Sequence, residues 1–119
     1  MPRYIEAGER AVRLHAGALA QSPAGYSTLL AALEDTLTPP ASVLLTGDPA
    51  ACADWQRALE ERYRPATRVF NVAGVEGLPP ALVKGATEAR SAAWVCRGTQ
   101  CLLPLHALAA IERALDGDR

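Results

Sequence analysis

Residues 42–49 read SVLLTGDP, and this stretch decides the fold. Its first five residues form a short apolar run, which is typical of a strand buried on both faces of a parallel sheet. Gly47 and Asp48 then supply a turn and a helix cap, and Pro49 suits the first position of a helix. A second strand is expected at residues 67–72, after that helix. Strand, helix and strand predict a right-handed crossover between two parallel strands.

The chain that follows this crossover predicts one more strand and one more helix. Residues 73–91 are rich in glycine and proline, so we expect a long connection with at most one helical turn, around residues 81–84. A third strand is predicted at residues 92–96, and a last helix begins at Pro104. The sequence therefore predicts an α/β fold whose three-stranded parallel sheet, of order 2-1-3, is flanked by helices as in one half of a Rossmann fold.

The residues before this unit predict a helical hairpin. Apolar or small residues recur every three or four positions in residues 4–20 and again in residues 26–37, which indicates two amphipathic helices. Pro39 and Pro40 end the second helix, because a proline disfavours helical geometry at the residue before it. We expect a single domain over residues 1–119, with a helical hairpin at 1–40 and an α/β unit at 41–119.

Composition argues against several classes of protein. Of the 119 residues, 50% are apolar and 21% are charged, which is typical of a globular domain. Twelve basic and thirteen acidic residues give a net charge of −1 without a basic run, so nucleic-acid binding is not expected. No apolar stretch is long enough to span a membrane, and the first residues do not resemble a signal peptide. Three cysteines do not make a disulfide framework, so we expect a cytoplasmic protein.

The carboxyl ends of the strands are where an open parallel sheet binds its ligands. In the predicted parallel sheet, three segments converge at this edge, namely 46–48, 71–77 and 96–101. The first segment lies at a helix N-terminus, which favours the binding of anions. Its sequence lacks the pattern of a phosphate loop, however, and the negative charge of Asp48 would repel an anion. Asp48 is more simply a helix cap. The weak candidates for an anion site are Gly47, Asp48, Arg97 and Gly98.

Two cysteines, Cys96 and Cys101, flank a basic turn that contains a glycine. As a redox pair they would need α-carbons within about 7 Å of each other. As a nucleophile, Cys96 would have a thiol pKa lowered by the positive charge of Arg97. Alternatively, both cysteines are apolar packing residues without a chemical role. His106 would bring the number of metal ligands to three, whereas a structural zinc site takes four. We therefore expect no metal and no cofactor, and we keep the other interpretations open.

The stretch AWVCRGTQC at residues 93–101, followed by Pro104 and a terminal helix, resembles the C-terminal end of the YyaL-like thioredoxin-domain-containing proteins. These are relatives of the spermatogenesis-associated thioredoxin-like protein. The resemblance implies a chain similar to the tail of a longer protein, in which a thioredoxin-like domain and a helical toroid come first. It also implies that those domains, in the same or a companion protein, are partners of this chain. It implies no established catalytic role for the tail itself.

Two functions are therefore expected as alternatives. The first is a non-catalytic structural or interaction domain, in which the apolar stripe of Ile5, Val12 and Leu19 would drive self-association, as a homodimer through the first helix, when the larger partner is missing. The second is a thiol redox or sulfur-handling module that uses Cys96 and Cys101. The two differ in one property, because only the second needs an accessible, reactive thiol.

Overall fold

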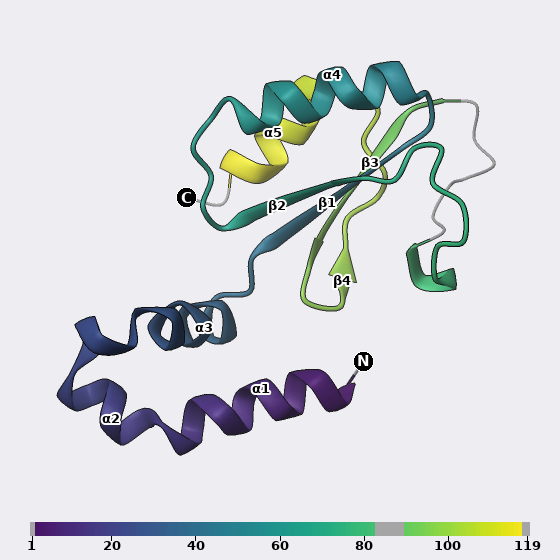
Figure 1. Ribbon diagram of the computed structural model, residues 1–119. Coiled ribbons are helices and arrows are strands. Elements are labelled where there is room, and N and C mark those ends of the chain that lie inside the picture. Colours follow the sequence, from purple (N-terminus) through teal and green to yellow (C-terminus); the bar gives the residue numbers. More distant parts are fainter. Residues whose placement is uncertain (1, 83–89, 118–119) are drawn as a thin grey trace. The chain divides into compact units, whose positions relative to one another are not determined.

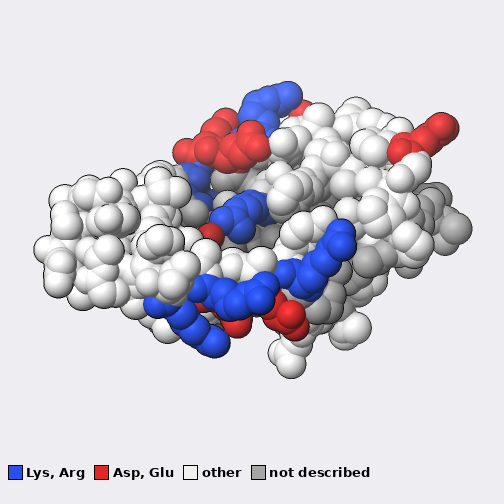
Figure 2. Space-filling view, turned by 60° about the horizontal axis from the view of Figure 1, so that its bottom comes forward, with Lys and Arg blue, Asp and Glu red and all other residues white. Residues whose placement is uncertain are grey.

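The structure is a computed structural model that describes residues 2–82 and 90–117 (Figure 1). The chain divides into two compact units, Met1–Pro39 and Pro40–Arg119, and each is described by itself. No helix among the described residues is both long enough and apolar enough to cross a membrane. On the face drawn in Figure 2, basic and acidic side chains lie next to one another.

The first unit is built of helices only. Its elements are α1 (Pro2–Leu14), α2 (Ala16–Gln21), the 3-10 turn η1 (Pro23–Tyr26) and α3 (Ser27–Leu37). The first expected helix is thus interrupted at His15, and the second begins with a 3-10 turn at Pro23, which cannot donate a backbone hydrogen bond. Among the described residues of this unit only Val12 and Leu19 are buried.

The second unit is a mixed sheet with two longer helices. Its elements are β1 (Ala41–Thr46), α4 (Pro49–Glu60), β2 (Thr67–Asn71), the 3-10 turn η2 (Pro80–Leu82), β3 (Ala92–Arg97), β4 (Gln100–Cys101) and α5 (Leu108–Asp116). The strand order is β2-β1-β3-β4. β1 and β2 are parallel, with Ala41 beside Thr67 and Leu45 beside Asn71. The strand–helix–strand unit predicted from residues 42–72 is therefore confirmed.

The third strand runs in the opposite direction from the one predicted. β3 is antiparallel to β1, with Ala41 beside Arg97 and Thr46 beside Ala92, and β4 adds a fourth strand, antiparallel to β3. The predicted order 2-1-3 is right, but the all-parallel sheet is wrong. A parallel third strand would need a crossover, usually a helix, to carry the chain back to the starting end of β1. Among the described residues of this connection the only helical element is the short η2, and the chain enters β3 at the end where β1 finishes.

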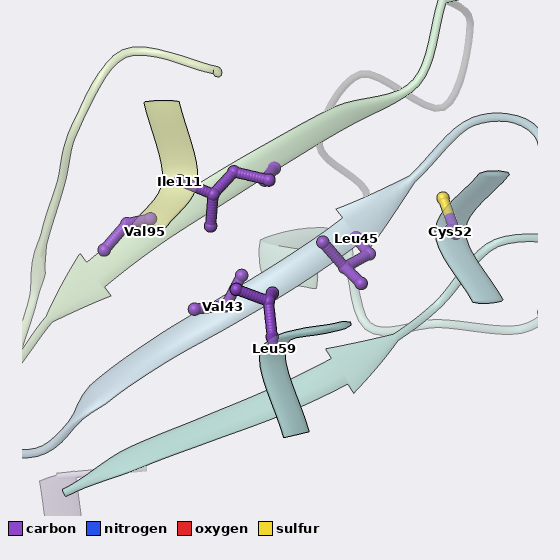
Figure 3. Close-up of a cluster of buried hydrophobic side chains, with 7 residues drawn as sticks. Val43, Leu45, Cys52, Leu59, Val95 and Ile111 are labelled. Atoms are coloured by element: carbon purple, nitrogen blue, oxygen red, sulfur yellow. The ribbon is translucent and has the colours of Figure 1, made fainter. Parts of the chain in front are cut away.

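The core lies on one face of the sheet, under α4 and α5 (Figures 1 and 3). Alternate residues of β1 and β3 point into it, and they meet Cys52 and Leu59 of α4 and Ile111 of α5. The sheet residues in this cluster are Val43, Leu45, Ala93 and Val95, with Val69 of β2 packed against them. The residues between them belong to the other face, where Leu44 lies between Phe70 and Trp94 in one row across three strands.

Candidate functional site

A tight hairpin joins β3 to β4 at the edge of the sheet. Arg97 lies opposite Gln100, so the turn consists of two residues, Gly98 and Thr99. Gly98 has a φ of 60°, in the left-handed region that favours glycine. A two-residue turn with glycine in its first position is one of the two standard hairpin turns. The local sequence thus sets which residues of the two strands face each other.

That pairing places the two cysteines directly opposite each other. Cys96 of β3 lies beside Cys101 of β4 with 3.9 Å between their α-carbons, and a disulfide joins them, with an S–S distance of 2.02 Å. The next pair along the hairpin is hydrogen-bonded, because the Leu102 N–H donates to the Val95 carbonyl at 2.9 Å. The cysteines therefore form a non-hydrogen-bonded pair, in which facing side chains are closest.

The two ends of the disulfide differ in their exposure. Cys96 is only 9% exposed, whereas Cys101 belongs to the exposed strand β4. A molecule from solution therefore reaches the disulfide from the Cys101 side. While the bond is intact neither sulfur is a thiolate, so a nucleophilic role for Cys96 would first require reduction.

The candidate anion residues are not brought together. Since β3 is antiparallel to β1, Arg97 lies beside Ala41 at the start of β1, while Gly47 and Asp48 follow the end of β1. The expected convergence of the segments 46–48 and 96–101 is therefore wrong. The physical reason is the strand direction, because only parallel neighbours have their carboxyl ends at the same edge.

The turn after β1 has a structural explanation of its own. The Asp48 carboxylate accepts a hydrogen bond from the Ala51 N–H at 3.0 Å and so caps α4. The Asp48 N–H donates to the Ser91 hydroxyl at 3.2 Å. Gly47 has a φ of 111°, and a Cβ placed on it would lie 2.6 Å from the Ser91 Cα. Glycine is thus required here by the close approach of the Ser91 backbone.

His106, the third candidate metal ligand, and the remaining cysteine, Cys52, each contact a backbone carbonyl. The Nδ1–H of His106 donates to the Ser91 carbonyl at 3.0 Å, near the start of β3 and away from the disulfide at its other end. Among the described residues no group of three or more potential ligands could hold a metal. The Cys52 thiol is fully buried and lies 3.3 Å from the Thr46 carbonyl. Burial raises the pKa of this thiol above its ordinary value of 9.0, which keeps it protonated and inert.

The sequence identified the two cysteines but not their arrangement. The missed element was β4, which has only two residues. Its signal was present in residues 96–101, CRGTQC. The central pair, Gly98 and Thr99, begins with a glycine and has two residues on each side, which is the pattern of a hairpin with a two-residue turn. Searches with this chain found no matching protein-family model, no similar curated protein and no similar solved structure.

Proposed function

We propose that this chain is a thiol–disulfide module that exchanges electrons with a dithiol partner. The observation that carries the proposal is the disulfide between Cys96 and Cys101, which lies on an edge hairpin with its Cys101 side exposed. The partner suggested by the sequence resemblance is a thioredoxin-like domain of the same or a companion protein. Such domains offer an accessible pair of thiols, one of which has a lowered pKa.

The proposed exchange moves two electrons and two protons. A partner thiolate attacks the Sγ of Cys101, the bond between the two cysteine sulfurs breaks, and the Sγ of Cys96 leaves as a thiolate and takes up a proton. The second partner thiol then loses its proton and attacks the partner sulfur of the mixed disulfide. The Sγ of Cys101 leaves and is protonated, and the two partner sulfurs become joined in a disulfide. This chain gains two electrons and ends with two thiols, and the partner loses the same two electrons.

The position of the disulfide on the hairpin favours a bond that can be reduced and re-formed, because the fold does not depend strongly on it. The core cluster lies under α4 and α5 and contains neither Cys96 nor Cys101. The bond closes a loop of only six residues, from Cys96 to Cys101, for which the chain-entropy estimate is about 2 kcal/mol of stability. The turn at Gly98 has the local geometry that glycine favours, and the Leu102 N–H bonds the Val95 carbonyl next to the disulfide. The reduced thiols would therefore stay opposite each other and could be reoxidised.

The proposal is tested by trapping the mixed disulfide. The probe is a thioredoxin that keeps its attacking cysteine and lacks the resolving one, incubated with the native, oxidised chain. We expect a covalent complex whose peptide map places the bond on Cys101, with no bond on Cys96. Cys52 is the internal control, because a free thiol that belongs to no disulfide cannot be attacked by the probe thiolate.

Two results would overturn the proposal. One is a disulfide that survives excess reduced thioredoxin until the chain is unfolded. The other is a trapped complex found equally on Cys96 and Cys101, which would mean that the probe does not approach from the exposed side. A Cys101→Ser variant, which cannot form the bond, should give no complex through the exchange step under the same conditions.

A second candidate function is an interaction domain, and it is favoured by the helical unit. Of the stripe expected to drive association, Val12 and Leu19 are buried and only Ile5 is exposed, at 61%. The apolar side chains of Tyr4 and Leu14 on α1 are exposed as well, at 62% and 79%. A helix surface of this kind is normally covered. We propose that these apolar side chains pack against the thioredoxin-like and helical-toroid domains that the resemblance suggests. One chain can have both functions.

A further inference from the structure

Among the residues that the structure describes, no strand pairs with the outer edge of β2. β2 is the end strand of the order β2-β1-β3-β4, and it has five residues, TRVFN, with no proline and no lysine among them. The opposite edge ends in the two-residue strand β4. Proteins usually protect exposed edges with short strands, prolines, bulges or charged side chains, especially lysines, because unpaired backbone groups attract another strand. The β4 edge is short, whereas β2 has five residues and carries a single charge, Arg68.

The backbone of β2 shows which groups face outward. The Ala41 N–H donates to the Ala66 carbonyl and the Val72 N–H donates to the Leu45 carbonyl, so even-numbered residues of this segment pair with β1. In a parallel ladder the residues between them direct their N–H and C=O groups to the other side. Val69, at the middle of β2, therefore presents both of its backbone groups at the open edge.

We propose that β2 pairs with β2 of a second copy of this chain, in an antiparallel register centred on Val69. The two Val69 residues would then exchange both hydrogen bonds across a two-fold axis. In this register Thr67 lies opposite Asn71 of the second copy, and Arg68 lies opposite Phe70. The sheets of the two copies join into one.

The side chains of β2 make this register self-complementary. Arg68 and Phe70 are exposed and lie on the face opposite the core, while Val69 packs toward the core. Each Arg68 would meet an aromatic ring across the interface, in a non-hydrogen-bonded pair whose side chains are closest, and a guanidinium over a ring is attractive. Moving the centre to position 68 would instead oppose two arginines, which is unfavourable. A second copy is therefore the occupant that this edge fits best.

The test compares two substitutions that remove the same ring. Phe70→Arg places Arg68 opposite an arginine in both of the 68–70 pairs of the dimer, whereas Phe70→Glu places each Arg68 opposite one carboxylate. Sedimentation equilibrium at low salt should show association at least tenfold weaker for Phe70→Arg than for Phe70→Glu. The double variant Arg68→Glu with Phe70→Arg reverses both charges, and its association should return. Phe70 is 49% exposed, so all three variants are expected to fold, which circular dichroism checks.

Each other outcome contradicts the register. Equal weakening by Phe70→Arg and Phe70→Glu would indicate non-specific contact through the ring or a register centred on Phe70. Association unchanged in all three variants would mean that the copies do not pair through β2. A wild-type chain that stays monomeric at high concentration would exclude the pairing altogether. None of these results bears on the disulfide exchange, which is measured separately.

Discussion

At the scale of single residues, Gly47 is explained by the packing of the backbone and not by the binding of an anion. Its φ of 111° disfavours any other residue, and the Ser91 backbone occupies the space that a Cβ would need. Gly77 also has a positive φ, 73°, but nothing lies within 4 Å of the position of its Cβ. A side chain at either position would strain the backbone, but only at Gly47 would it also overlap with other atoms.

We predict that Gly47→Ala lowers the free energy of unfolding by more than Gly77→Ala does. Gly77→Ala carries only the cost of a left-handed conformation, about 1–2 kcal/mol. Gly47→Ala adds the overlap with Ser91, which forces β1 and β3 to shift, so a loss of about 3 kcal/mol or more is expected. Urea denaturation of both variants measures the difference. Equal losses would mean that the Ser91 backbone moves aside at no cost.

At the scale of elements, an ion pair ties the end of α5 to the connection between α4 and β2. The side chain of Arg64 is 8% exposed and donates from Nε and from a terminal nitrogen to the two oxygens of Asp116, both at 3.1 Å. It also donates to the Leu59 carbonyl at the end of α4. Such a bidentate contact between a guanidinium and a carboxylate orients both groups and is stronger than a single hydrogen bond.

Asp116→Ala should therefore destabilise the second unit by about 2 kcal/mol, because it leaves the buried guanidinium of Arg64 without this carboxylate. The value is below that of a fully buried pair, since the Asp116 side chain is 30% exposed. Asp54→Ala is the matched control. It breaks the exposed pair of α4 with Arg57, and such pairs contribute at most about 1 kcal/mol. Thermal unfolding followed by circular dichroism compares them, and similar losses would argue against a structural role for Arg64.

Elements also show where sequence patterns succeed and fail. The apolar run of β1 and the cap at Asp48 are local signals, and both led to correct elements. The direction of β3 was predicted wrongly, because an apolar run has the same composition whichever way it points. The better signal was negative, since the connection before β3 has too many glycines and prolines for a crossover helix.

At the scale of the whole molecule, the two units differ in how much apolar surface they bury. The second unit has a continuous core, whereas in the described part of the first unit only Val12 and Leu19 are buried. Isolated short helices are marginal in water, and most of their stability comes from packing of the apolar face. The helical unit is therefore the part that gains most from a partner.

We predict that Ile5→Glu weakens self-association of the isolated chain, because it places a charge in the exposed apolar surface of α1. Ala7→Glu is the control, since it makes the same change of charge at another exposed position of the same helix. Sedimentation velocity over a range of concentrations distinguishes the two. If both substitutions act alike, net charge rather than the apolar surface governs association, and the interaction proposal loses its support.

The sequence by itself determined the parts of this protein that depend on neighbours in the chain. These are the helical character of the first unit, the strand–helix–strand unit and the cap at Asp48. Each follows from periodicity, from a short-range hydrogen bond or from residue type. Only the tertiary structure decided the direction of β3, the separation of Gly47 and Asp48 from Arg97 and Gly98, and the disulfide itself. These depend on which end of the sheet the chain enters after residue 91, and that choice is made by packing between segments far apart in sequence.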